Sequence, residues 1–196
     1  MGPGWKEWNR SDIIYGIIAP VLVVLLIVGI SRLGSLFGGG FGIATGITME
    51  LQELVVIAVV PLLLGLVWNR WAGGASGFLL GSLYALYWAP SYRTYHGGGP
   101  ILLGYVVSAM LIGYIAGALN KGSENFRRIL ISGLVATTVG GIMLFGIFQI
   151  SSVNVVLGFE GWLLTVLPRI AVAVVIAVMA KVFAWYGVFP GRKPDL

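Results

Sequence analysis

Residues 163–185 read LLTVLPRIAVAVVIAVMAKVFAW, and this stretch decides the class of fold. Its apolar run is long enough for a helix that crosses a bilayer, which needs about 20 residues. Near its beginning, however, Pro168 is followed by Arg169. A charge at the centre of a membrane helix costs about 2.5–3.5 kcal/mol on insertion scales. Arg169 therefore needs a negative partner or a wet cavity.

The composition extends this interpretation to the whole chain. Of the 196 residues, 58% are hydrophobic and only 10% are charged. Soluble domains carry about 25% charged residues. The apolar residues come in long runs rather than in alternation with polar ones, which is typical of membrane helices. We therefore expect an all-α integral membrane protein with a single domain, residues 1–196.

Short polar or glycine-rich connections separate six apolar segments. We expect one bundle of six membrane-spanning helices, at residues 13–33, 50–68, 72–89, 101–119, 126–150 and 161–186. Pro61 is expected to kink the second segment, because proline removes a helical hydrogen bond. An even number of crossings places both termini on the same side of the membrane.

The distribution of basic residues predicts which side this is. Three lie toward the opposite side: Arg32, Arg93 and Arg169. Nine lie on the side of the termini: Lys6, Arg10, Arg70, Lys121, Arg127, Arg128, Lys181, Arg192 and Lys193. Cytoplasmic ends of membrane helices carry an excess of Lys and Arg. Both termini are therefore expected in the cytoplasm, in a multi-pass protein of the plasma membrane.

Small residues recur at every fourth position in several segments, which favours close helix packing in lipid. The packing partner is either another helix of this chain or a second subunit. The ribbons are Gly73, Gly77, Gly81, Ala85 and Ala89, then Ala109, Gly113 and Gly117, and finally Gly133, Thr137 and Gly141.

Three glutamates are candidate partners for Arg169 on the outer side. Glu50 and Glu53 are three residues apart and share one helix face, and Glu160 precedes the sixth segment. Arg169 is expected to meet one of them, or an anionic group of a ligand in an outward-opening pocket. Two interpretations stay open. The charges either clamp the second segment to the sixth, or bind a ligand, or do both.

Other side chains at the same level complete the candidate ligand-binding site. Small-molecule sites combine apolar and aromatic walls with a few placed polar groups. Aromatic residues are also expected at membrane interfaces whatever the function. The candidates for ring stacking are Trp88, Tyr92, Tyr105 and Trp162, and those for hydrogen bonding are His96, Gln149 and Asn154.

Catalysis finds little support in the sequence. Cysteine is absent, there is one histidine, and no metalloprotease, nucleophile or phosphate-loop motif occurs. We expect a protein that is not an enzyme and has no catalytic residue, metal site or cofactor. The scattered basic residues follow helix ends, so we expect no nucleic acid as a partner.

Three stretches resemble the substrate-binding S components of energy-coupling factor (ECF) vitamin transporters. VVPLLLGLVWNRWAGGASGFLLGSLYALYW, residues 59–88, is similar to their hairpin of second and third helices. GYVVSAMLIGYIAGALNKGSENFRRILISGLVA, residues 104–136, is similar to their fourth and fifth helices. Residues 163–183 are similar to their last helix with its leading proline. Members often carry alanines four apart on the first helix, where this chain has Gly16 and Ala19.

The resemblance implies a six-helix protein that captures a vitamin or related micronutrient on the outer face. It implies a site formed by the loop 37–49 with Tyr105, Asn154, Glu160, Trp162 and Arg169. It further implies docking, through cytoplasmic faces, onto a transmembrane coupling subunit served by two ATPases. The expected partners are then a small-molecule ligand, membrane lipid and this coupling module. The alternatives are a structural or accessory subunit of a larger membrane complex and, third, a self-sufficient carrier or channel.

Overall fold

The structure is a computed structural model that describes residues 52–96, 100–151 and 158–186. The expected first segment, 13–33, and the loop 37–49 lie outside the described residues. The described part is all-helical and contains no strand. Its elements are the π-helix η3 (Leu54–Val59) and the α-helices α4 (Val60–Val67), α5 (Arg70–His96), α6 (Pro100–Asn120), α7 (Phe126–Ser151) and α8 (Phe159–Trp185).

Three of these helices are long and apolar enough to cross a membrane. They are α6 over Leu102–Asn120, the whole of α7 and the whole of α8. The helical run of η3 and α4 is apolar but shorter, at Leu54–Val67. These helices agree with the expected segments to within a few residues, except that α5 continues past Ala89 to His96. The all-helical class predicted from the sequence is therefore confirmed, with three helices that could span a membrane.

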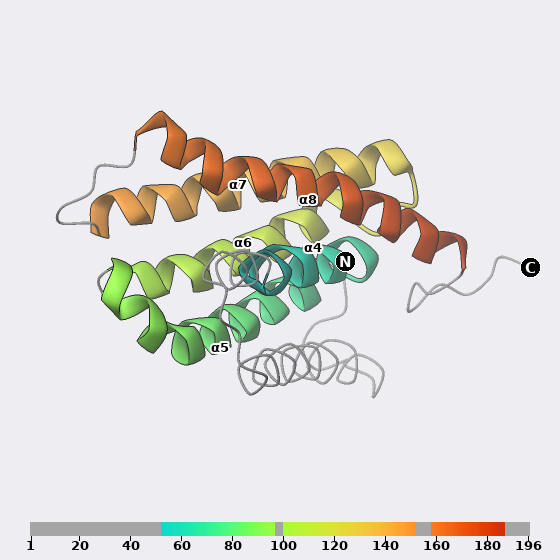
Figure 1. Ribbon diagram of the computed structural model, residues 1–196. Coiled ribbons are helices and arrows are strands. Elements are labelled where there is room, and N and C mark those ends of the chain that lie inside the picture. Colours follow the sequence, from blue (N-terminus) through green and yellow to red (C-terminus); the bar gives the residue numbers. More distant parts are fainter. Residues whose placement is uncertain (1–51, 97–99, 152–157, 187–196) are drawn as a thin grey trace, which may run out of the picture.

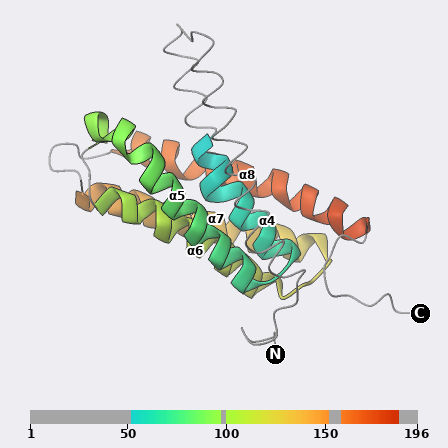
Figure 2. The same cartoon turned by 90° about the horizontal axis from the view of Figure 1, so that it is seen from below.

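The helices form one layered bundle with η3 and α4 near its centre (Figure 1). In chain order, α5 packs against α6, α6 against α7 and α7 against α8. The α4 helix contacts α5, α6 and α8. Figure 2 shows the long axes of α5, α6, α7 and α8 running along the same general direction. The centrally placed η3 and α4 can therefore present side chains to helices from both sides of the bundle.

Glycines bring three helices into backbone contact. A Cβ added to Gly113 on α6 would lie 2.1 Å from the carbonyl oxygen of Gly73 on α5. A Cβ on Gly65 of α4 would lie 2.3 Å from the carbonyl oxygen of Gly113. A Cβ on Gly77 would lie 2.2 Å from the carbonyl oxygen of Ala109. The small-residue ribbons therefore serve packing within this chain, because any side chain here would collide with backbone.

The second expected segment differs from a simple proline-kinked α-helix. Its first part, η3, is a π-helix, and the α-helix α4 begins just before Pro61. Proline has no N–H to donate and its ring crowds the preceding turn. Widening the turns that precede Pro61 is one way to accommodate both effects. Glu53 lies directly before this irregular turn, and π-turns inside helices are frequent at functional sites.

Two asparagines form hydrogen bonds at the α4–α5 connection and at the end of α6, far from Glu53 along these helices. Asn69 Oδ1 accepts hydrogen bonds from the backbone N–H groups of Trp71 and Ala72, at 2.9 and 2.8 Å, which caps the start of α5. Asn120, at the end of α6, is fully buried and donates from Nδ2 to the carbonyl of Leu66 at 2.8 Å. These bonds satisfy backbone groups that helix ends leave open.

The glycine contacts lead to a stability prediction. Gly113→Ala is expected to lower the free energy of unfolding in detergent by about 1–3 kcal/mol, the usual cost of overpacking. Gly146→Ala on α7 is the matched control, because a Cβ there meets nothing within 4 Å. It is expected to be neutral or to stabilise by up to about 1 kcal/mol, since alanine favours the helix over glycine. Equal thermal unfolding of the two variants would contradict the packing described here.

Candidate functional site

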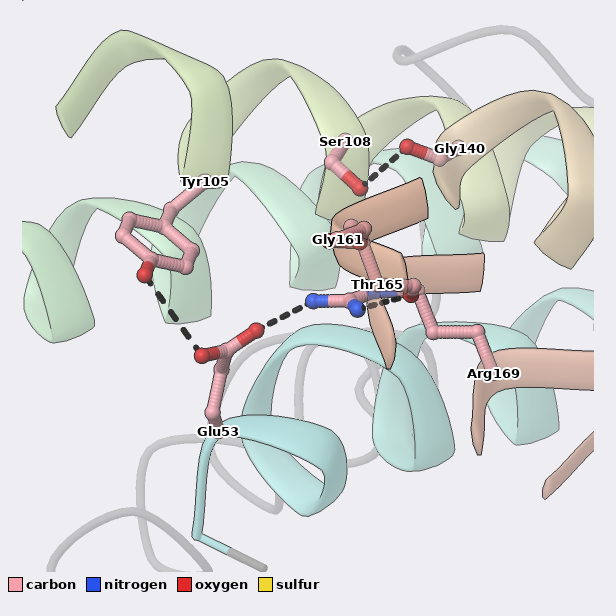
Figure 3. A network of polar contacts seen from close by, with 7 residues as sticks. All are labelled: Glu53, Tyr105, Ser108, Gly140, Gly161, Thr165 and Arg169. Carbon is pink, nitrogen blue, oxygen red and sulfur yellow. Dashed lines mark hydrogen bonds and ion pairs between the residues drawn. The ribbon is translucent and has the colours of Figure 1, made fainter. Parts of the chain in front are cut away.

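The side chain of Arg169 is buried between helices and paired with a glutamate. Arg169 belongs to α8 and is only 3% exposed. Its Nη2 donates to Oε1 of Glu53, which lies directly before η3 and whose side chain is 15% exposed. The prediction that Arg169 meets one of the three glutamates is thus confirmed, and the glutamate is Glu53. The pair joins the second segment to the last one (Figure 3).

The rest of the guanidinium is only partly satisfied. Long helical side chains lean toward the helix N-terminus, and Arg169 accordingly reaches back to donate from Nη1 to the carbonyl of Thr165. The Thr165 hydroxyl donates to the carbonyl of Gly161 at 2.8 Å. The Nε of Arg169 is buried and has no hydrogen-bond partner. A guanidinium has five N–H donors, so this group retains capacity to bind a further acceptor.

Tyr105 on α6 contacts the second carboxylate oxygen of Glu53, the one that Arg169 does not bind. Its hydroxyl lies 3.5 Å from Oε2 of Glu53, a long contact, and its ring is 4% exposed. The ring packs edge-to-face against Tyr84 of α5 and Phe148 of α7, with centroid separations of 5.0 and 5.7 Å. An aromatic wall from three helices therefore stands beside the ion pair.

A glycine on α7 and a serine on α6 lie close to the ion pair. A Cβ on Gly141 would lie 3.5 Å from Cδ of Arg169, an ordinary van der Waals distance, so the arginine side chain packs against α7 at this position. Ser108, one turn after Tyr105, donates to the carbonyl of Gly140 at 2.9 Å. Figure 3 shows this bond next to the Glu53–Arg169 pair.

The charged pair is buried between the helices and lies closer to the start of α8 than to its end. Arg169 is about 24 Å from Trp185 along α8, and Tyr105 is about 22 Å from Asn120 along α6, at 1.5 Å per residue. The hydrocarbon core of a bilayer is about 30 Å thick. Arg169 is about 15 Å from the start of α8 and Tyr105 about 8 Å from the start of α6. The burial of Arg169 shows that its side chain stays between the helices instead of extending along the surface of the bundle.

Glu160 and Trp162 are not brought to this cluster. Glu160 is exposed on the first turn of α8, about 13 Å along the helix from Arg169. Trp162 is half-buried and stacks on Phe159 of its own helix, with ring centroids 5.8 Å apart. Gln149 is half-buried near the end of α7.

The remaining candidates cannot be placed. Glu50 and Asn154 lie outside the described residues. Trp88, Tyr92 and His96 fall on the last part of α5, whose side chains lie outside the described part of the structure.

Sequence reasoning missed two members of the cluster, Ser108 and Thr165. The spacing offered a signal for Thr165, because it precedes Arg169 by four residues and its carbonyl lies on the same face. Ser108 gave none, since its partner is a backbone carbonyl on another helix.

The cluster of Glu53, Tyr105 and Arg169 is suited to binding the polar groups of a ligand in an apolar environment. The cluster combines one cation, one carboxylate and a phenol, and its formal charge is zero when both ionisable groups are charged. Within residues 52–96, 100–151 and 158–186, no three His, Cys, Asp or Glu side chains gather as a metal site would need.

Comparison with known proteins adds no assignment: the chain matches no protein-family model, and neither a curated protein nor a solved structure shows significant similarity to it.

Proposed function

We propose that this protein is a membrane-embedded, non-enzymatic subunit that binds a vitamin or a related small micronutrient. The observation that carries the proposal is the buried Arg169, which keeps an unpartnered Nε although it is paired with Glu53. Ionisable residues inside membrane helices mark ligand or ion pathways by default.

Polar groups of the ligand would bind at Arg169, Glu53 and Tyr105. A ring on the ligand could stack on the aromatic wall that Tyr84, Tyr105 and Phe148 form. The resemblance to ECF S components supports the same function, because those proteins bind vitamins in a six-helix membrane protein. By that resemblance, transport depends on a separate coupling subunit and two ATPases.

We further propose that the chain crosses the plasma membrane six times and that both termini lie in the cytoplasm. The positive charges of the described residues support this orientation. Arg70, Lys121, Arg127, Arg128 and Lys181 all lie at or next to the connections α4–α5 and α6–α7 and the end of α8. An excess of Lys and Arg is typical of cytoplasmic ends.

The orientation is tested by thiol labelling, for which the chain offers a cysteine-free background. Ser123→Cys lies in the α6–α7 connection and Gly158→Cys directly before α8, where a Cβ meets nothing within 4 Å. In intact cells an impermeant maleimide is expected to label the cysteine at 158 and not the one at 123. Labelling at 123 alone would place the termini outside.

Ligand binding is tested by purifying the protein and identifying co-purifying small molecules by mass spectrometry, followed by thermal-shift assays with a panel of water-soluble vitamins. Tyr105→Phe is the informative variant. It removes one hydroxyl with a long contact, so its stability is expected to change by less than about 1.5 kcal/mol. A ligand bonded to that hydroxyl is expected to bind about 3- to 10-fold more weakly, since a neutral hydrogen bond contributes about 0.5–1.5 kcal/mol.

Asn120→Ala is the matched control. It removes a buried polar side chain at the opposite end of the bundle, so it is expected to lower stability and to leave ligand affinity unchanged. Absence of any ligand from the wild-type protein and from the whole panel would contradict the proposal.

That negative result would favour the second candidate, a structural subunit of a larger complex. The direct Glu53–Arg169 pair is the observation in its favour, because it joins the second segment to α8 without any ligand. Co-purification of large subunits without ATPases would support it further.

A further inference from the structure

An open pocket lies at the end of the bundle that carries the basic residues. Its volume is about 440 Å³, and it is lined by Glu124, Lys181, Ala184 and Trp185. It therefore lies where the α6–α7 connection meets the last turns of α8. This place is distant from the Glu53–Arg169 pair, because Lys181 is about 18 Å further along α8 than Arg169.

Lys181 has donors left for a ligand in this pocket. Its Nζ donates to the backbone carbonyl of Glu124 at 2.9 Å, and the contact is exposed to solvent. An ammonium group has three N–H donors. The bond to Glu124 holds the group in place at the pocket, and its other hydrogens can bind an acceptor such as a phosphate oxygen.

The charges around the pocket favour an anion. Lys121, Arg127 and Arg128 are exposed in or next to the same connection, and Glu124 is the one carboxylate among residues 121–128. The first turn of α7 contains no acidic residue. The connection beside the pocket is therefore basic overall, although only Lys181 and Glu124 among these charged residues line the pocket itself.

An exposed apolar track leads from the pocket along α8. Val174, Val178 and Val182 recur every fourth residue and are 46%, 50% and 40% exposed. They share one helix face. Trp185, which is 87% exposed, follows at the end of the helix, where membrane proteins place tryptophan at headgroup level. A free phosphate ion would use none of this surface, whereas the acyl chains of a lipid would lie along it.

We propose that this pocket binds the headgroup phosphate of an anionic phospholipid, with Lys181 as the hydrogen-bond donor. An acyl chain of the same lipid packs against the Val174–Val178–Val182 face of α8. Basic pockets beside membrane helices on the cytoplasmic side are suited to such headgroups. The site is independent of the proposed ligand binding but rests on the orientation proposed above, with this end of the bundle in the cytoplasm.

The test uses the full chain in detergent, titrated with phosphatidylglycerol or phosphatidylcholine and followed by native mass spectrometry. The wild-type protein is expected to retain one phosphatidylglycerol in preference to phosphatidylcholine. Lys181→Gln is expected to weaken this binding about fivefold, the effect of one basic residue at a membrane surface. Lys181→Arg is expected to keep it, because the positive charge remains.

Arg70→Gln is the matched control. Arg70 is an exposed cation at the same end of the bundle, but it lies over the ring of Trp71 at the start of α5 and does not line the pocket. Its loss is expected to change lipid affinity little. Equal weakening by Arg70→Gln and Lys181→Gln would overturn the proposal in favour of diffuse surface charge.

Two further outcomes would also overturn it. Equal retention of both lipids would indicate non-specific boundary lipid. Displacement of the bound phosphatidylglycerol by inorganic phosphate at matched ionic strength would indicate a site for a free anion.

Discussion

The positive charge of Arg169, held away from both water and lipid headgroups, is the constraint on which this bundle depends. Taking such a charge out of water costs several kcal/mol even after relaxation, and Glu53 offsets that cost through direct contact. The two residues are 116 positions apart in the chain. Because the contact is direct, a slip of η3 or α8 by one residue would turn the partners away from each other. The pair therefore fixes the register of these two helices, whether or not it adds stability over an apolar pair.

Glycine packing determines what surrounds this pair. The contacts of Gly73 and Gly77 with α6 hold α5 and α6 at backbone distance. Further along the same seam, a Cβ on Gly81 would lie 2.7 Å from Cα of Val106, the neighbour of Tyr105. This close approach lets the rings of Tyr84 and Tyr105 meet beside the carboxylate. The seam that lipid-embedded helices need for association thus also builds the aromatic wall of the candidate site.

The sequence predicted the helices and the central contact for simple reasons. Long apolar runs leave few alternatives to helices in a membrane, and a buried arginine has few possible partners when acidic residues are rare. It could not select Glu53, because Glu50 and Glu53 share a face and Glu160 lies on the same helix as Arg169. The structure separates Glu160 from the cluster because Arg169 contacts Glu53 on the neighbouring segment, whereas Glu160 is exposed on the first turn of α8.

Features that depend on the distance between helices were beyond sequence reasoning. The bond from Ser108 to the carbonyl of Gly140 exists only because α6 and α7 approach closely there. The π-helix η3 reflects how Pro61 is accommodated next to packed neighbours, and the pattern around Pro61 predicted only a kink. Trp162 was expected at the site because its position along the sixth segment placed it at a similar depth in the membrane to the other candidates. Depth alone does not determine which way a side chain on α8 faces.

The account is tested most directly by a double-mutant cycle on the ion pair, with the free energy of unfolding measured in mixed micelles. Arg169→Gln and Glu53→Gln each leave one buried charge without its partner and are expected to lower stability by about 3–5 kcal/mol. The double variant, which buries no charge, is expected to lose about 1–3 kcal/mol less than the sum of the two. Strictly additive losses would show that the two charges do not interact, and would contradict the central claim.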